Sequence, residues 1–381
     1  MSSSRLDRQL AEIRLSLLRG DLSAAAYGAA AAIARPEPSE DLVEIVETVA
    51  AVLATCWALH ESELAEHLIG EMPLSARPAI GLLAEKHALG ALEAEPHPSA
   101  ESYLPVARAA DLVRTSSSLG SEWRGFADWY LAKAGQATGA SDWAEQMEQA
   151  CCALEALDSA GSTKGLLGML SIGRAELAEH YSGLSQPHEA FAQMKHALDL
   201  ERRMASGPHF ETVTKSALLA ARTGHGDEAR KIALEGIEMV EAIASPGYAE
   251  MANARGLLLL EGVLAYGEMT RLLVSLAGMA DRVKPFNEVV WHLAAVAAAH
   301  EARGSWEDAR SLWRRTADMA SQLGLDGVLG ATSRMGLVRA EIELGNESEA
   351  RLHLQEAAQL LSVWPDPEAE RAVALFGSML D

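Results

Sequence analysis

The phrase Glu-Leu-Ala-Glu-His occurs twice, at residues 63–67 and 176–180, and is the closest approach of this sequence to a metal-binding motif. In the first copy Glu63 and His67 lie one helical turn apart, so both side chains could reach the same ion. A metal site needs further ligands, and neither an HExxH motif nor a cluster of cysteines and histidines accompanies the phrase. A solvated Glu–His pair is the simpler interpretation, and we predict no metal site.

Motifs for nucleophilic catalysis and phosphate binding are also missing. The sequence contains no GxSxG, and the pair Cys151-Cys152 lies in an Ala- and Leu-rich stretch rather than among basic residues. The glycines of 323–330 are not followed by the Lys and Ser or Thr of a phosphate-binding loop. We therefore expect no enzymatic activity and no cofactor.

The pattern that does recur is structural: a glycine followed five residues later by a small residue. Clear copies are Gly20…Ala25, Gly139…Ala144, Gly224…Ala229, Gly304…Ala309 and Gly345…Ala350. Looser copies are Gly267…Leu272, His60…Ala65 and Ser185…Ala190, and the gap between 60 and 139 leaves room for one more near Ser99. The copies recur about every 40 residues, and a period of this size is typical of solenoid proteins.

The composition and the positions of glycine and proline favour helices throughout the chain. Hydrophobic residues make up 49% of the sequence but aromatic residues only 5%, which suits packing between Ala- and Leu-rich helices. Glycines mark the turn within each unit, because glycine adopts the left-handed conformation that ends a helix at little cost in energy. Proline and serine cluster between units, as at 35–38, 245–247 and 364–367. The sequence thus predicts an all-α string of helical hairpins.

This combination resembles the tetratricopeptide repeat, in which the small residue is followed four residues later by a bulky one. Trp313 after Ala309 and Leu354 after Ala350 keep that step. The period near 40 exceeds the 34 residues of the family and looks more like the subgroup found in bacterial sensor and scaffold modules. The resemblance implies a right-handed superhelix, an α-solenoid, of about nine antiparallel helix-turn-helix repeats over residues 1–366. Residues 367–381 would form a C-terminal capping helix.

In such folds the first helix of each hairpin lines a concave groove, which is where the resemblance implies that a partner binds. Aligning the hairpins by their Gly-to-Ala step places three tryptophans and five charged residues on this face. They are Trp57, Trp129, Trp291, Lys133, Glu179, Glu211, Glu261 and Arg339. Tryptophan often anchors binding sites, and an aromatic, acidic groove would suit a peptide that carries Arg or Lys. The alternative is that these tryptophans fill gaps between adjacent hairpins, as we expect of Trp313.

The best-known peptide site of the family, the carboxylate clamp of chaperone adaptors, needs Asn and Lys on successive first helices. Asparagine occurs only at 253, 287 and 346, and Lys133 with Arg339 cannot rebuild the clamp. We therefore do not expect binding of chaperone C-terminal tails.

The net charge and the cysteines indicate which kinds of partner the protein can bind and which cellular compartment it occupies. The chain carries 32 basic and 54 acidic residues, a net charge of −22, which repels nucleic acid and could steer a basic partner or simply maintain solubility. Three cysteines without a CxxC pair suggest buried thiols in a reducing compartment. No apolar run is long enough for a membrane span, and the first ten residues lack a signal-peptide core. A cytoplasmic location follows.

Three functions are compatible with these observations. We favour a non-enzymatic regulatory protein or adaptor that binds a protein or peptide in the groove of the superhelix. A small-molecule or signalling-peptide sensor module of a bacterial regulatory system is the alternative. A self-associating structural protein is the third, since nothing in the sequence opposes a dimer or larger homo-oligomer.

Overall fold

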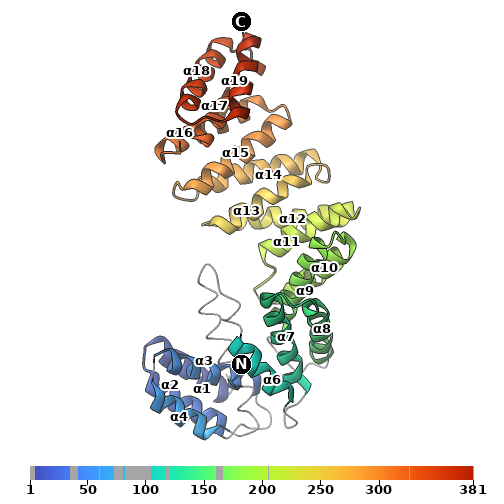
Figure 1. Cartoon of the computed structure of the whole chain (residues 1–381), viewed down its shortest axis with the longest axis vertical. Helices are drawn as coiled ribbons and strands as arrows, with labels where there is room; N and C mark the ends of the chain where they lie inside the picture. Colours follow the sequence, from blue (N-terminus) through green and yellow to red (C-terminus); the bar gives the residue numbers. More distant parts are fainter. Residues whose placement is uncertain are drawn as a thin grey trace. The chain divides into compact units, whose positions relative to one another are not determined.

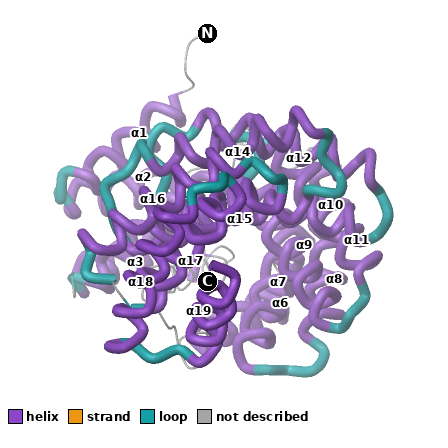
Figure 2. The backbone as a smooth tube through the Cα atoms, turned by 90° about the horizontal axis from the view of Figure 1, so that it is seen from above, coloured by secondary structure: helices purple, strands orange, loops and turns teal. Residues whose placement is uncertain are grey.

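The computed structural model describes most of the chain, and every regular element in the described part is helical (Figure 2). The described residues are 5–34, 42–59, 61–72, 80–81, 104–115, 121–159, 166–204, 206–325 and 327–380. Within these ranges there is no β-strand. The predicted all-α fold is confirmed.

The chain divides into two compact units. Unit 1 comprises Met1–Leu184 with Asp199–Ala205, and unit 2 comprises Ser185–Leu198 with Ser206–Asp381. The helix α10 (Pro187–Arg202) contributes to both. The predicted division of the chain into a repeat array over 1–366 and a cap over 367–381 stays a prediction.

Unit 1 is built from helical hairpins in which successive helices pack against each other (Figure 1). Its helices are α1 (Arg5–Leu18), α2 (Leu22–Ala34), α3 (Leu42–Ala58), α4 (Ser62–Glu71), α6 (Leu104–Thr115), α7 (Ser121–Thr138), α8 (Trp143–Ser159) and α9 (Leu166–Gly183). The closest pairs are α1 with α2, α6 with α7, and α7 with α8. Leucine, isoleucine and alanine side chains from all of these helices form its buried core.

Unit 2 continues in the same style from α11 to α19 (Figure 1). Its helices are α11 (Phe210–Arg222), α12 (Gly226–Ala242), α13 (Tyr248–Gly256) with the 3-10 helix η2 (Leu257–Leu260), α14 (Tyr266–Ala280), α15 (Asn287–Ala302), α16 (Trp306–Gln322), α17 (Val328–Glu343), α18 (Glu347–Val363) and α19 (Pro367–Leu380). Each first helix contacts the first helix of the next hairpin: α11 with α13, α13 with α15, α15 with α17 and α17 with α19. A row of first helices is therefore the structural basis of any shared face in this unit.

The turns inside the hairpins repeat one geometry. After α15 the chain passes through Gly304 at φ 71°, and the N–H of Ser305 donates to the carbonyl oxygen of His300 at 2.9 Å. This is the Schellman motif, which needs a left-handed residue and therefore favours glycine. Gly20, Gly139, Gly224 and Gly345 have the same conformation. Ser185 takes it at φ 58° in the copy without glycine, so the predicted turn positions are confirmed at these six places.

The small residue five positions later is buried in every copy that the structure describes. These residues are Ala25, Ala65, Ala144, Ala190, Ala229, Ala309 and Ala350. A methyl side chain at this point lets the second helix approach the first closely. The spacing thus links the turn and the packing of the pair, as expected for hairpins of the tetratricopeptide type.

The copy at Gly267 is an exception to the pattern. Gly267 is the second residue of α14 and has no positive φ, so it does not form the turn. The chain reverses earlier, through η2 and residues 261–265, and the side chain of Glu268 accepts the N–H of Ala265 at 2.8 Å to cap the new helix. Leu272 is nevertheless buried, because it lies on the inner side of α14. The predicted turn at Gly267 was wrong.

Two predicted copies lie outside the described residues: the turn at residue 60 and the copy near residue 99. The repeat number of about nine and the right-handed superhelical course therefore stay predictions. At the other end, α19 packs on α17 and α18, in the place expected for the capping helix.

Candidate partner-binding site

The three candidate tryptophans differ strongly in exposure. Trp291, on α15, is 51% exposed, and Trp57, near the end of α3, is 39% exposed. Trp129, on α7, is only 6% exposed. Two of the three can therefore offer contact area to a partner.

Trp129 packs inside unit 1 because α9 passes directly over it. Gly173 of α9 has no side chain, and a Cβ there would lie 2.8 Å from both Trp129 Nε1 and Cys151 Sγ. The indole also meets the ring of Tyr130 edge-on, with centroids 5.0 Å apart. The placement of Trp129 on an open groove is thus corrected: it fills the space between hairpins, which was the alternative interpretation.

Of the two charged candidates of unit 1, Lys133 belongs to its internal packing. Lys133 forms an ion pair with Glu176 of α9 and donates to Gln136 Oε1 at 3.3 Å. Both members of the ion pair are mostly buried. Glu179, one turn further along α9, is exposed. Lys133 therefore fixes α7 against α9 rather than presenting a free cation.

The same contacts explain the two Glu-Leu-Ala-Glu-His phrases. Glu176 is engaged by Lys133, and the ring of His180 meets the Trp143 ring edge-on at 5.1 Å. In the first copy the His67 ring lies 4.7 Å from that of Tyr27. Among the residues the structure describes, no three His, Cys, Asp or Glu side chains gather as a metal site would require. These histidines serve helix packing.

In unit 2 the first helices carry a set of ion pairs, which we call the first-helix ion pairs. They are Glu211 with Lys215 (2.6 Å), Arg255 with Glu288, Arg303 with Glu261 (3.4 Å) and Arg339 with Glu301 (3.0 Å). Three of the four join neighbouring hairpins. The predicted residues Glu211, Glu261 and Arg339 are all members, so each of them faces a charge of opposite sign.

Arg339 also supports Trp313, the tryptophan expected in the core. Trp313 is buried, and its Nε1 donates to Glu301 Oε1 at 2.7 Å. The Arg339 guanidinium lies 5.9 Å from the centre of the same indole. Gly336 makes room for the ring, since a Cβ at that position would overlap it. Arg339 is thus a packing residue, and the interpretation of Trp313 is confirmed.

Large apolar side chains remain exposed beside the first-helix ion pairs. Trp291 is accompanied by Tyr248 and Leu259, which are 66% and 72% exposed. Trp291 follows the ion-paired Glu288 by three residues, and Leu259 follows its partner Arg255 by four. Both apolar side chains therefore lie about one helical turn beyond the same ion pair, on neighbouring first helices. Nothing in the sequence singles out Tyr248 and Leu259, because neither has a distinctive neighbour there.

The inner side of α15 carries two buried histidines. Burial lowers the pKa of His292, although its Nε2 lies 2.9 Å from the carbonyl oxygen of Leu276 and donates to it in the neutral ring. Burial also lowers the pKa of His300. Both rings are therefore neutral members of the core at pH 7, and neither is offered to a ligand.

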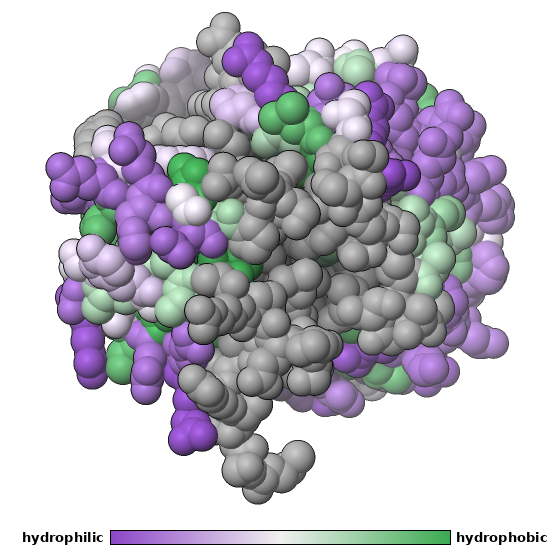
Figure 3. All heavy atoms as spheres, turned by 90° about the horizontal axis from the view of Figure 1, so that it is seen from below, coloured by the Kyte–Doolittle hydropathy of each residue, from purple (hydrophilic) through white to green (hydrophobic). Residues whose placement is uncertain are grey.

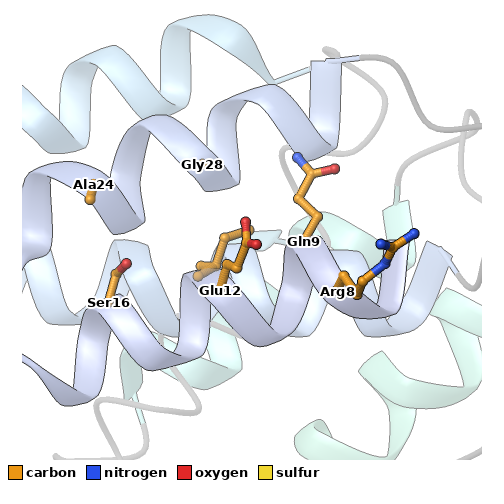
Figure 4. A pocket seen from close by; sticks show the side chains of 7 residues that line it. Arg8, Gln9, Glu12, Ser16, Ala24 and Gly28 are labelled. Carbon is orange, nitrogen blue, oxygen red and sulfur yellow. The ribbon is translucent and has the colours of Figure 1, made fainter. Parts of the chain in front are cut away.

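A hollow of about 630 Å³ lies in unit 1 between α1 and α2 (Figure 4). The α1 side is polar, with Arg8, Glu12 and Ser16 spaced one turn apart, and Gly28 of α2 forms part of the opposite wall. The volume falls within the range of small-molecule sites. No motif marked these residues, although α1 and α2 are consecutive helices of one hairpin joined by the turn at Gly20.

The thiols follow the expectation only in part. Cys56 and Cys151 are buried, and burial raises the pKa of Cys151 to about 12, so it is an inert thiol. Cys152 is exposed, contrary to prediction, because it is one residue further round α8. Its Sγ lies 3.8 Å from Arg174 Nη2.

The described surface is mainly hydrophilic on the face drawn in Figure 3, where apolar residues occur in small separate groups. This agrees with the excess of acidic residues in the sequence. No helix of the described part is both long enough and apolar enough to cross a bilayer.

Comparison with solved structures finds similar helical-repeat proteins. A Podosopora anserina putative kinesin light chain with nearly identical TPR-like repeats is 16% identical, and the match covers 51% of this chain and 96% of that one, with a TM-score of 0.41. The apo form of RapI is 9% identical over 99% of this chain and 82% of that chain, with a TM-score of 0.37. The apo form of the quorum sensor NprR from B. thuringiensis is 14% identical, covering 82% and 98%, with a TM-score of 0.35. No protein-family model matches the chain. No curated protein matches it either.

Proposed function

We propose that the protein is a non-enzymatic adaptor or regulator that binds a protein or peptide on the first-helix face of unit 2. The observation that carries this proposal is the exposure of Trp291, Leu259 and Tyr248 on successive first helices. Large apolar side chains of this kind dominate binding energy where they can be desolvated by a partner.

The first-helix ion pairs support the proposal in a second way. Arg255–Glu288 and Arg339–Glu301 tie α15 to its neighbours on both sides. Trp291 therefore projects from a helix whose position is fixed before a partner arrives. Such pre-organisation lowers the entropy lost on binding.

The test is capture of a cross-linked partner from host extract with the full chain as bait. Trp291→Ala should reduce recovery of a specific partner about tenfold or more, because a buried tryptophan anchor is worth at least about 2 kcal/mol. Trp364→Ala is the matched control, since Trp364 is 57% exposed and lies just after α18. Equal recovery with the wild type and both variants would contradict the proposal. Trp57→Ala tests the corresponding prediction for unit 1.

The hollow between α1 and α2 favours a second candidate, a small-molecule sensor. Arg8 and Glu12 offer one cationic and one anionic group on the same wall, which suits a small zwitterionic or polar ligand. A thermal-shift screen of metabolites on the wild type should then give hits that Arg8→Ala and Glu12→Ala abolish. Hits that survive both substitutions, or no hits, would eliminate this candidate.

A further inference from the structure

The two acidic residues predicted on the first-helix face of unit 2, Glu211 and Glu261, are already paired within the protein. Every acidic residue predicted there, and each of Glu288 and Glu301, has a lysine or arginine partner among the first-helix ion pairs. Glu288 and Glu301 are also mostly buried. A third charge approaching such a pair meets a dipole rather than a free carboxylate, so its attraction is small.

Among the second helices of this unit, α12 has the largest acidic excess. On α12 there are five acidic residues and two basic ones: Asp227, Glu228, Glu235, Glu238 and Glu241 against Arg230 and Lys231. The second helix of a hairpin is the one that does not carry Trp291, Leu259 or Tyr248. Part of the net charge of −22 therefore lies on a helix that does not carry those side chains.

The exposed stripe of α15 has a defined length. Trp291, Ala298 and Ala302 share one side of the helix, at spacings of seven and four, and all three are exposed. Eleven residues of helix from Trp291 to Ala302 span about 16 Å. An extended peptide covers this length with about five residues.

We propose that the segment bound on this face is an uncharged, apolar peptide stretch of about five residues, with bulky side chains that pack on Trp291 and Leu259. This inference rests on the proposed function and replaces the basic peptide expected from the aromatic and acidic residues assigned to the groove. Next to Trp291, lysine or arginine would lose hydration and meet Glu288, which is already paired with Arg255, whereas leucine or phenylalanine side chains would cover exposed Trp291 and Leu259.

The test selects peptides from a random-sequence display library on the full chain. One enriched peptide is then synthesised, and its affinity is measured by fluorescence anisotropy at about 50 mM and about 500 mM salt. We expect enrichment of Leu, Phe and Trp over Lys and Arg, and a Kd that changes less than about threefold with salt, because screening weakens only charge–charge attraction.

Two substitutions and two matched controls locate the site. Trp291→Ala and Leu259→Ser should each weaken the selected peptide about tenfold. Trp364→Ala and Val274→Ser should leave it unchanged, since Val274 is equally exposed but lies on the second helix α14. Far-ultraviolet circular dichroism of each variant checks that the helices are intact.

The outcomes separate this inference from the proposed function. Enrichment of apolar peptides whose affinity depends on Trp291 and does not change with salt supports both proposals. Lys- or Arg-rich peptides that depend on Trp291 and lose affinity at high salt overturn the apolar partner and leave the adaptor proposal standing. If no peptide is enriched, the apolar peptide is overturned and the adaptor proposal is decided by the capture experiment. If peptide binding is indifferent to Trp291→Ala and Leu259→Ser, both proposals fail.

Discussion

Trp129 in unit 1 and Trp291 in unit 2 lie on first helices of comparable hairpins, yet one is buried and the other is exposed. Trp129 precedes the turn glycine Gly139 by ten residues, whereas Trp291 precedes Gly304 by thirteen. Three residues of helix rotate a side chain by about 300°, or about 60° the other way, which moves it from the inner to the outer side. Ala294, ten residues before Gly304, is buried like Trp129. Residue type alone therefore does not identify a binding residue in these hairpins.

The neighbouring hairpin also contributes to the difference in exposure between the two tryptophans. Above Trp129, α9 offers Gly173, so the backbone can approach and cover the indole. On the hairpin next to Trp291, α13 carries the ion-paired Arg255 and η2 carries the exposed Leu259. The first arrangement uses tryptophan to join hairpins, and the second leaves it available to a partner.

The largest expected effect separates the two tryptophans by stability. Trp129→Ala should lower the free energy of unfolding by about 3–5 kcal/mol, because it leaves a cavity between α7 and α9. Trp291→Ala should cost less than about 1 kcal/mol, because most of the ring is in water. Urea unfolding followed by circular dichroism measures both. Losses of similar size would show that the contrast in burial is wrong.

A smaller effect tests why Trp129 is covered. Gly173→Ala should destabilise the protein by about 1–3 kcal/mol, since the added methyl would press on Trp129 Nε1 and Cys151 Sγ. Gly168→Ala in the same helix is the control, because nothing lies within 4 Å of its Cβ position. That control should be neutral or stabilising by up to about 1 kcal/mol. The comparison fails if the two substitutions have the same sign and size.

Two turn residues test the turn geometry that the hairpins share. Ser185→Gly should stabilise by about 1 kcal/mol, because a non-glycine residue at φ 58° is strained. Gly304→Ala should destabilise by about the same amount, since no atom lies near its Cβ position and only the backbone conformation opposes the methyl. Thermal or urea unfolding of both variants measures these changes in stability. Effects of the same sign would contradict a shared turn geometry.

The smallest effect concerns the two sides of α15, where exposed Trp291 is followed by buried His292. Burial holds the pKa of His292 below its usual value, so the unfolded chain binds the proton more readily. Stability is fully present above the unfolded pKa of about 6.5 and is lost as the pH falls through that value toward the lower pKa of the folded state. Arg255 opposes protonation, and Glu288 and the carbonyls of Leu276 and Met251 favour it.

Urea unfolding between about pH 7.5 and about pH 5 measures this dependence. His292→Gln should flatten the loss of stability on the acid side while leaving the first-helix face unchanged. His188→Gln, at an exposed histidine, is the control and should keep the wild-type profile. An unchanged profile in His292→Gln would show that His292 is not the group responsible.

Much of the local architecture could be predicted from the sequence, because it depends on interactions within about ten residues. A glycine that tolerates positive φ, followed by a small residue on the facing helix, defines a hairpin wherever it occurs. Gly267 shows where this reasoning fails: its spacing was right, but Glu268 caps a helix that begins at Tyr266, so the turn comes earlier.

The candidate site was predicted less well. Trp57 and Trp291 were named and are exposed, while Trp129 was named and is buried. Glu211, Glu261 and Arg339 were assigned to a ligand and are engaged by charges of the protein itself. The partners of Glu261 and Arg339 lie about 40 residues away, in a neighbouring hairpin, where no local pattern reveals them.

The sequence by itself determined that this chain forms helical hairpins and where most of them turn, since backbone conformation and short-range packing depend on adjacent residues. Only the tertiary structure decided which side chains remain available to a partner. Exposure depends on the rotation of each helix about its axis and on what the next hairpin places over it, as Gly173 does for Trp129 and Glu301 does for Arg339. A rotation of one residue, about 100°, is enough to turn a contact residue into a core residue.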